Sequence, residues 1–163
     1  MKSIALIHTV KTVANSFEQK LKDYVGEPVK IHNLWDDFLA NNPNEIGEFT
    51  IENRCRLYND IKSAEMTGAD MIVVTCSTLT PVVNMIRPFV RVPLIAIDDA
   101  MGRKAVTCGE RILVLATAGS TEGPMREKLN AEALKMGSTT QFTATEAGQA
   151  LEYMAQTRKR FRL

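Results

Sequence analysis

Short apolar runs, each about as long as one β-strand, alternate along this chain with segments whose apolar residues recur at helical spacing. Four of these runs occupy residues 3–8, 70–75, 92–97 and 111–116. Parallel strands need a crossover of about a dozen residues between them, and a helix usually forms that crossover. The pattern therefore predicts an α/β protein, with a doubly wound parallel sheet that carries helices on both faces.

Turn residues and apolar spacing predict the remaining elements. A helix should end at Gly26, and a short strand should follow at residues 28–32. The polar stretch 33–48 contains an Asn-Asn-Pro-Asn run, and it is predicted to form a loop or a lid. Helices are also predicted at residues 50–67, from residue 80 onward, and at 98–106, 120–136 and 146–158, with a strand at 139–143.

The composition excludes several kinds of partner. The 163 residues include 20 Lys and Arg against 19 Asp and Glu, so the basic excess that nucleic-acid binding requires is absent, and a small neutral or anionic ligand is expected. The longest apolar runs are far shorter than the ~20 residues of a membrane helix, and the first residues are predicted to form a strand instead of a signal peptide. No glycine-rich nucleotide-binding motif follows any predicted strand.

The cysteine pattern indicates a reducing compartment. The three cysteines, at positions 55, 76 and 108, are an odd number and form no CxxC pair. This pattern argues against a disulfide framework and against a structural zinc site. We therefore expect a cytoplasmic protein that holds no metal.

Ligands of open parallel sheets bind beyond the carboxyl ends of the strands, and in this chain those ends carry polar side chains. The first predicted strand ends in His8 and Thr9, and the strand at 70–75 is followed by Cys76. Because parallel strands end at the same edge of a sheet, we expect these side chains to lie near one another. The full set comprises His8, Thr9, Thr75, Cys76, Ser77, Thr78, Asp98, Asp99, Thr117, Ser120 and Thr121.

Cys76 is the strongest candidate for chemistry in this set. A helix is predicted to start just after it, with Thr80 as a capping hydroxyl and Pro81 at the first helical position. A helix N-terminus stabilises a thiolate, which can act as a base or as a nucleophile. The alternative is that Cys76 only fills the core, as buried cysteines often do, but its polar neighbours favour a functional role.

The other two cysteines are predicted to be structural or incidental. Cys55 lies in the middle of a predicted helix, on or near an apolar face with Ile51, Tyr58 and Ile61. Cys108 precedes a predicted strand, which places it at the opposite edge of the sheet from the crevice.

More than one interpretation stays open for each of the other polar residues. Ser120 and Thr121, in the turn before Pro124, are typical either of a carboxylate-binding helix start or of ordinary capping. Asp98 caps the next helix, orients a catalytic group without touching the substrate, or does both. His8 is either a histidine satisfied within the protein or a contact to the ligand.

Three segments taken together resemble the aspartate/glutamate/hydantoin racemase superfamily. Residues 68–78 read Gly-Ala-Asp-Met-Ile-Val-Val-Thr-Cys-Ser-Thr, residues 92–98 read Val-Pro-Leu-Ile-Ala-Ile-Asp, and residues 109–121 end in Ala-Thr-Ala-Gly-Ser-Thr. The similarity extends to about residue 135. It implies a cofactor-independent enzyme with two α/β lobes, here residues 1–97 and 98–163, and an active site between them. A homodimer is usual among the proteins that the chain resembles.

The resemblance also implies roles for individual residues. Cys76 would be the first catalytic thiol, acting as acid/base at the α-carbon of an amino acid or another small carboxylic acid. Ser77 and Thr78 would bind the carboxylate or carbonyl of the substrate. The cleft would further be lined by His8 and Thr9 and, from the other lobe, by Thr117, Ser120 and Thr121.

One part of the superfamily's mechanism is absent from this sequence. Inversion of the α-carbon requires a proton source on the opposite face, which in the superfamily is a second cysteine in the matching half of the chain. Neither Cys55 nor Cys108 is predicted to lie there, and the second lobe is predicted to be incomplete at Leu163. Three functions stay open: a racemase-like isomerase, a single-cysteine decarboxylase-like enzyme, and a protein or fragment that only binds carboxylates.

Overall fold

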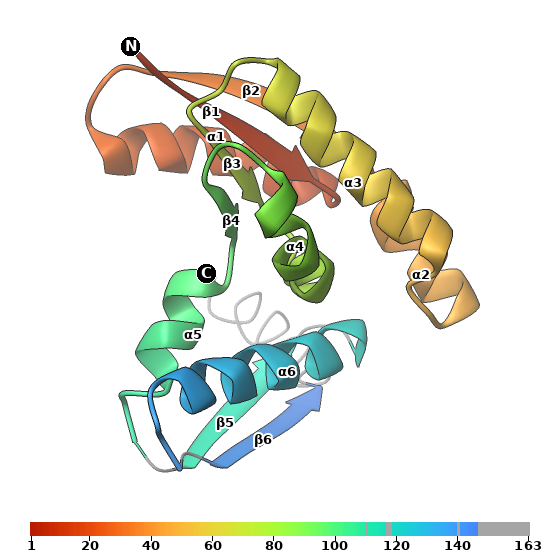
Figure 1. Ribbon diagram of the computed structural model, residues 1–163, viewed down its shortest axis with the longest axis vertical. Helices are drawn as coiled ribbons and strands as arrows, with labels where there is room; N and C mark the ends of the chain where they lie inside the picture. The colour runs from red at the N-terminus through yellow and green to blue at the C-terminus, as the bar shows by residue number, and fades with distance from the viewer. Residues whose placement is uncertain (110, 117–118, 140, 147–163) are drawn as a thin grey trace, which may run out of the picture. The chain divides into compact units, whose positions relative to one another are not determined.

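The computed structural model describes residues 1–109, 111–116, 119–139 and 141–146. They belong to two compact units, Met1–Asp99 and Ala100–Leu163, and each unit is described by itself. Figure 1 labels the helices and strands of both. Within the described residues, no helix combines the length and the apolar character that crossing a membrane requires.

The first unit is built on a parallel sheet with the strand order β2–β1–β3–β4. The chain leaves β1 toward one edge to form β2, and then crosses back to place β3 on the other side of β1. This reversal makes the carboxyl ends of β1 and β3 a topological switch point, where ligands bind in open parallel sheets. The strands are β1 (Lys2–His8), β2 (Val29–Trp35), β3 (Met71–Val74) and β4 (Leu94–Ala96).

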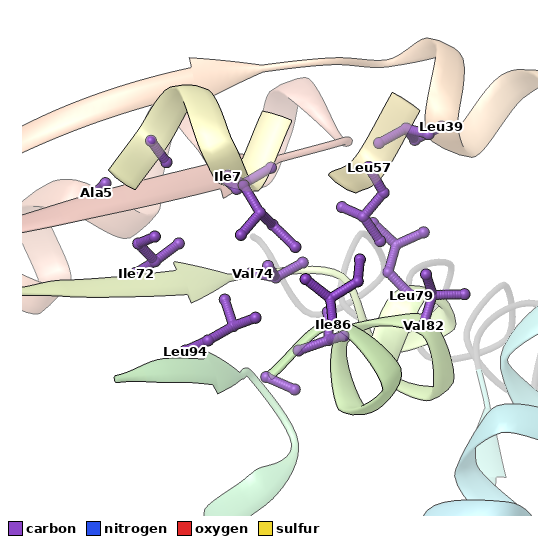
Figure 2. Packing of buried hydrophobic residues seen from close by; sticks show 14 of the residues in the cluster. Ala5, Ile7, Leu39, Leu57, Ile72, Val74, Leu79, Val82, Ile86 and Leu94 are labelled. Atoms are coloured by element: carbon purple, nitrogen blue, oxygen red, sulfur yellow. The ribbon is translucent and has the colours of Figure 1, made fainter. Parts of the chain in front are cut away.

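Helices pack against both faces of this sheet. On one face, Ile7 belongs to an apolar cluster that also contains Leu57 of α3 and Ile86 of α4, as Figure 2 shows. On the other face, Phe17 of α1 meets the His8 ring edge-on, with 6.0 Å between the ring centroids. The helices of this unit are α1 (Lys11–Val25), α2 (Phe38–Ile46), α3 (Ile51–Met66) and α4 (Thr80–Ile86), with the short 3-10 helices η1 (Ser77–Leu79) and η2 (Arg87–Phe89).

The alternation of side chains along the strands decides which residues reach which face. Ile7 lies in the apolar cluster beneath α3 and α4, so Leu6 and His8 lie on the face of α1. The same alternation separates Val74, which lies in the cluster, from Thr75, whose hydroxyl reaches His8. The alternation of side chains therefore decides on which face of the sheet each polar residue at the ends of β1 and β3 lies.

The stretch 33–48 contains a strand end and a helix, so its prediction as a loop or lid is wrong. β2 continues to Trp35, and α2 follows with Pro43 inside it. Leu39 and Pro43 are buried, and α2 packs against α3. The burial of these two side chains outweighs the preference of the Asn-Asn-Pro-Asn run for a turn.

The buried face of α3 also differs from the predicted one. Ile61 is buried as predicted, but Cys55 is exposed. Asn53 is buried because its side chain closes a capping box with Thr50 and donates to Asn42 Oδ1 at 3.1 Å. This polar anchor fixes the rotation of the helix, which apolar spacing alone did not predict. The buried residues of α3 are Asn53, Leu57, Ile61 and Ala64, while Ile51 and Tyr58 are exposed.

The described part of the second unit is a small α/β lobe. Its described strands, β5 (Arg111–Ala116) and β6 (Gln141–Glu146), pair in parallel. Helix α5 (Asp99–Ala105) precedes them, and α6 (Gly119–Lys135) packs against both strands. The strand predicted at 111–116 is confirmed, and the helix predicted at 120–136 is confirmed within one residue at each end.

One face of the strand β5 is open among the described residues of this unit. Leu113 and Leu115 are 63% and 61% exposed, whereas Ile112 and Val114 between them are half-buried. The alternation follows from the pleat of a strand that is covered on one side only. The helix predicted at 146–158 lies outside the described residues apart from its first residue, which belongs to β6.

Candidate functional site

The first unit gathers polar side chains beyond the carboxyl ends of its strands. His8 ends β1, and Thr75 follows β3 across the switch point. Backbone hydrogen bonds tie these ends together, because Thr75 N donates to Ile7 O at 3.0 Å and Asp36 N donates to His8 O at 2.9 Å. The edge is therefore a fixed frame for the side chains that it carries.

His8 is fully buried, and both of its ring nitrogens are engaged. Nδ1 lies 2.8 Å from Thr75 Oγ1 and Nε2 lies 3.2 Å from Asn33 Oδ1, while Asn33 Nδ2 donates to Glu18 Oε2 on α1 at 2.5 Å. Burial lowers the pKa of His8, and the Asn33 hydrogen bond and the charge of Glu18 act in the opposite direction. We call these four residues the His8 network. In this arrangement the ring offers no nitrogen to a ligand.

Thr9 differs from His8 because its buried hydroxyl is left without a partner. The residue is 3% exposed, and Oγ1 makes no hydrogen bond to any part of the chain that the structure describes. A buried polar atom without a partner is uncommon and calls for an explanation, such as a water or a bound ligand. The orphaned hydroxyl at the end of β1 is the kind of group that a carboxylate oxygen would satisfy.

Cys76 carries a free thiol in extended backbone two residues after the end of β3. It is half-buried and packs against the apolar cluster, so it is neither a fully buried core residue nor a fully exposed one. Ser77 and Thr78, also half-buried, begin η1. The single helix predicted after Cys76 is instead a 3-10 turn followed by the seven-residue α4. Elements this short supply little of the predicted dipole stabilisation.

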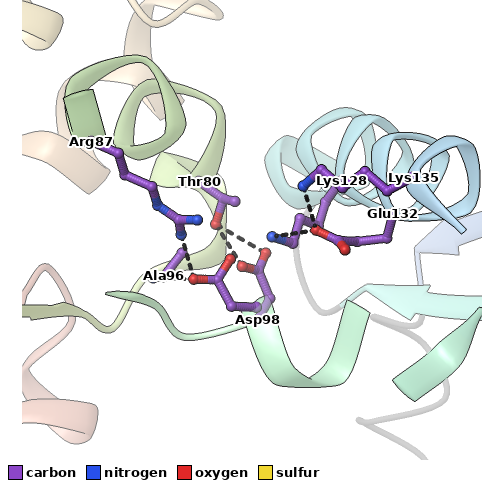
Figure 3. A network of polar contacts seen from close by, with 8 residues as sticks. Thr80, Arg87, Ala96, Asp98, Lys128, Glu132 and Lys135 are labelled. Carbon is purple, nitrogen blue, oxygen red and sulfur yellow. Dashed lines mark hydrogen bonds and ion pairs between the residues drawn. The ribbon is translucent and has the colours of Figure 1, made fainter. Parts of the chain in front are cut away.

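Thr80 does not cap α4 with its side chain, which corrects the prediction for this residue. Its hydroxyl lies 2.9 Å from both carboxylate oxygens of Asp98, as Figure 3 shows. Both residues are buried, so this hydrogen bond ties the end of β4 to the start of α4. Asp99 reinforces the connection, because its carboxylate accepts from Ala96 N at 2.9 Å and pairs with Arg87. Asp98 thereby supports the segment that follows Cys76.

A second titratable cluster, at the end of β2, was not predicted. Asp36 is buried and pairs with Arg56 of α3, and its Oδ1 accepts from Phe38 N at 3.2 Å. Asp60 lies one turn after Arg56, and its buried Oδ2 has no hydrogen-bond partner among the described residues. Burial, a hydrogen bond to Asp36 and the charge of Asp36 raise the pKa of Asp60 to about 7, against the effect of Arg56. We call Asp36 and Asp60 the acid pair.

The acid pair could have been found in the sequence only with a correct end for β2. Strand β2 was predicted to end at residue 32, which placed Asp36 in a loop. The observed strand ends at Trp35, so Asp36 is a strand-end residue like the others. The spacing of Arg56 and Asp60 by four residues was also visible, and it puts both on one face of a helix.

The second unit contains the other predicted contacts. Ser120 is exposed and Thr121 is half-buried, both in the first turn of α6, and Thr117 lies outside the described residues. Cys108 is exposed, with its thiol 3.3 Å from Lys104 O. Further along α6, Glu132 forms ion pairs with Lys128 at 3.3 Å and with Lys135 at 3.1 Å, as Figure 3 also shows. These pairs are spaced as neighbours on a helix surface usually are.

The arrangement of titratable groups does not indicate a metal centre. Among the described residues, no group of three or more His, Cys, Asp and Glu side chains lies close enough together to hold a metal ion. The groups that lie at the carboxyl edge are hydroxyls, one thiol, one imidazole and carboxylates. Such a set suits hydrogen bonding and proton transfer.

The amino-acid sequence matches the profile of one protein family over almost its whole length. The match is to the Asp/Glu/Hydantoin racemase family and covers residues 7–159. The chain belongs to this family. No curated protein is significantly similar to it in sequence.

Solved structures agree with the assignment of the fold. Glutamate racemase from Aquifex pyrophilus aligns with a TM-score of 0.63 and 16% identity, covering 88% of this chain and 54% of that protein. Aspartate racemase from Picrophilus torridus aligns with a TM-score of 0.63 and 14% identity, covering 88% of this chain and 62% of that protein. The chain therefore shares the racemase fold and spans between half and two thirds of the length of these two proteins.

Proposed function

We propose that this chain catalyses proton transfer at the α-carbon of a small carboxylic acid or amino acid, without a cofactor and with Cys76 as acid/base. The observation that carries the proposal is the position of Cys76, which follows β3 at the switch point of a sheet in a racemase-family protein. Aspartate, glutamate and hydantoin-type compounds are the substrates that the family name suggests.

The chemistry requires a base and hydrogen-bond donors for the negative charge that develops on the substrate. Removing a proton next to a carboxylate creates an enolate-like transition state, which donors aimed at its oxygens stabilise. In our proposal the Cys76 thiolate takes the proton. Ser77 and Thr78 bind the carboxylate, and the Thr9 hydroxyl, which has no partner among the described residues, donates to it. Thr117, Ser120 and Thr121 are proposed as further contacts on the resemblance alone.

The support that Asp98 gives to the site is indirect in this scheme. Its carboxylate accepts from the Thr80 hydroxyl and so holds the first residue of α4. Because η1 and α4 follow Cys76 without an interruption, this anchor limits the movement of Ser77 and Thr78. We therefore assign Asp98 a positioning role.

A single thiol favours decarboxylation as a second candidate activity. The two other cysteines are exposed, Cys55 on α3 and Cys108 ahead of β5, and neither follows a strand at its carboxyl end. One thiol can deliver a proton to one face of a carbanion, which is sufficient to complete a decarboxylation. Racemisation requires a second proton donor on the other face.

The test is deuterium incorporation at the α-carbon in D₂O, followed by NMR over a panel of aspartate, glutamate, hydantoins and 2-substituted acids. We expect exchange with at least one compound, and we expect Cys76→Ser to lower the rate by about 10² or more. Cys55→Ser and Cys108→Ser are matched controls that should retain the wild-type rate. Exchange that survives Cys76→Ser would refute the role of the thiol.

The second candidate is tested on malonate-type acids by measuring released CO₂. If CO₂ is released in a Cys76-dependent manner and no exchange occurs on amino acids, the chain is a decarboxylase. A carboxylate that raises the melting temperature without any turnover would instead identify a protein that only binds carboxylates.

A further inference from the structure

The His8 network contains enough hydrogen-bond information to place each of its protons. Glu18 Oε2 is a carboxylate oxygen and can only accept, so the Asn33 group that faces it must be the NH2. Asn33 Oδ1 therefore faces His8 Nε2, as the 3.2 Å contact shows. Because Oδ1 also only accepts, Nε2 must carry a hydrogen.

The second ring nitrogen then depends on the charge of His8. Burial lowers the pKa of His8, which favours the neutral ring, and a neutral ring with hydrogen on Nε2 has an unprotonated Nδ1. Thr75 Oγ1 lies 2.8 Å from Nδ1 and 3.1 Å from Ile7 O. Its single hydrogen therefore goes to Nδ1 when His8 is neutral. When His8 is charged, Nδ1 donates and the hydroxyl hydrogen turns to Ile7 O.

The surroundings of the ring come from three elements. Glu18 is the charged group that faces His8 from α1, and it is itself paired with Lys22. Asn33 from β2 and Thr75, which follows β3, are neutral. The protonation of His8 thus reverses one hydrogen bond next to Cys76 without moving a heavy atom out of hydrogen-bond distance.

We propose that Glu18 and Asn33 are positioning residues that fix His8 as the neutral tautomer with hydrogen on Nε2, so that His8 holds Thr75 and thereby sets the direction of Cys76. This inference rests on the proposed function for its effect on catalysis, but its structural part stands separately.

The link from Thr75 to Cys76 is the alternation of a strand. Thr75 is held on the α1 face by its backbone N, which donates to Ile7 O at 3.0 Å, and by its hydroxyl on His8. The next residue in extended backbone must turn to the opposite face, and Cys76 does pack against the apolar cluster there. If the position of Thr75 were less restricted, the position of the Cys76 thiol would therefore be less restricted as well.

Nitrogen-15 NMR of the histidine rings tests the tautomer directly, since the two tautomers have different Nδ1 and Nε2 shifts. His32 provides the only other histidine signal in the chain, and it is assigned by a His32→Gln variant. We expect wild-type His8 to show one tautomer, with hydrogen on Nε2. Glu18→Gln should mix the tautomers, because a glutamine amide no longer fixes the orientation of Asn33. The matched control Glu27→Gln removes an exposed charge just after α1 and should change nothing.

Asn33→Asp is the second variant, and it tests the tautomer and the pKa of His8 together. A residue with only a structural role would not change the pKa of His8 while keeping its tautomer. One oxygen of the new carboxylate still accepts from Nε2, so a neutral ring should keep its hydrogen there. The other oxygen can no longer donate to Glu18, and the added negative charge should raise the pKa of His8 above its wild-type value. A hydrogen on Nδ1 in the wild type would overturn the proposal. So would a Glu18→Gln spectrum identical to that of Glu27→Gln.

The effect on Cys76 is read from its alkylation rate in a Cys55→Ser, Cys108→Ser background. We expect Glu18→Gln to speed alkylation of Cys76 several-fold relative to Glu27→Gln, and to slow α-proton exchange by up to about 10². An unchanged alkylation rate would refute the link to the thiol. If the NMR and alkylation results hold but the wild type exchanges no substrate, the proposed function fails and the positioning of Cys76 stands.

Discussion

Two titratable clusters, each with one buried member, lie at the carboxyl edge of the same sheet, and they differ in how completely their polar atoms are satisfied. In the His8 network each ring nitrogen has a partner, and the network contains a single charged residue, Glu18. In the acid pair, two carboxylates face each other beside one arginine, and Asp60 Oδ2 has no partner among the described residues. The first arrangement favours a neutral group, and the second favours a bound proton.

The difference gives the two clusters opposite effects on stability as the pH changes. The pKa of His8 is lowered from 6.5, so the unfolded chain binds more protons as the pH falls below about 6.5, and folding is weakened in acid. The pKa of Asp60 is raised from 3.8 to about 7, so the folded chain keeps a proton that the unfolded chain releases. Stability from Asp60 is therefore lost as the pH rises from about 4 to 7. The two slopes oppose each other in the wild type.

Removing the His8 ring should have the largest effect on stability. His8→Ala leaves a cavity beneath α1 and removes the hydrogen-bond partners of Asn33 and Thr75, so we expect a loss of about 3 kcal/mol at pH 7 in urea unfolding. The loss should be smaller at pH 5, where the wild type already suffers from the protonation of its unfolded chain. His32→Ala, on the neighbouring strand, is the control and should cost about 1 kcal/mol or less. Equal losses for the two variants would mean that the buried ring of His8 contributes no more to stability than the half-buried ring of His32.

Asp60→Asn should have the next largest effect, and it should stabilise the protein. The asparagine amide can donate to Asp36 as a proton on Asp60 does, and it carries no charge, so the repulsion at high pH disappears. Asp60 is partly solvated, which weakens the effect of its raised pKa on stability, so we expect a gain of about 1–2 kcal/mol at pH 8 and almost none at pH 5. Asp37→Asn, an exposed neighbour of the pair, should change neither value. A gain that is equal at both pH values would contradict the shared proton.

The fold could be predicted from the sequence where local pattern and tertiary packing agree. Strand β5 was predicted at its observed bounds, and α1 ends at Gly26, whose φ of 68° is a conformation that glycine adopts without strain. The predictions failed where a polar side chain is buried. Asn53 is buried and so changes which face of α3 points into the core. Leu39 and Pro43 are buried, and their segment forms the helix α2 although its sequence favours a loop.

The sequence predicted which polar residues lie at the strand ends, but not their contacts. The rule that ligands bind at strand ends brought together His8, Thr9 and Cys76, which do lie at one edge of the sheet. The rule cannot tell which face of the sheet each side chain takes, or that a residue from α1 will complete a network. Glu18 is fifteen residues from Asn33 in the chain, and only the packing of α1 on β2 brings them together.

Removing the ion pair between Lys22 and Glu18 should have the smallest effect on stability. This variant also distinguishes the roles of the two carboxylate oxygens of Glu18. Lys22 contacts Oε1 at 2.5 Å, whereas Asn33 uses Oε2, so Lys22→Gln removes one contact and leaves the other. An exposed pair at i,i+4 contributes about 0.3–0.5 kcal/mol, so urea unfolding should show a loss of that size, and Lys20→Gln should show none. The His8 tautomer should stay the same as in the wild type by nitrogen-15 NMR at pH 7. A change of tautomer in Lys22→Gln would mean that Glu18 orients Asn33 only when Lys22 holds its carboxylate. Lys22 would then be a fifth member of the His8 network.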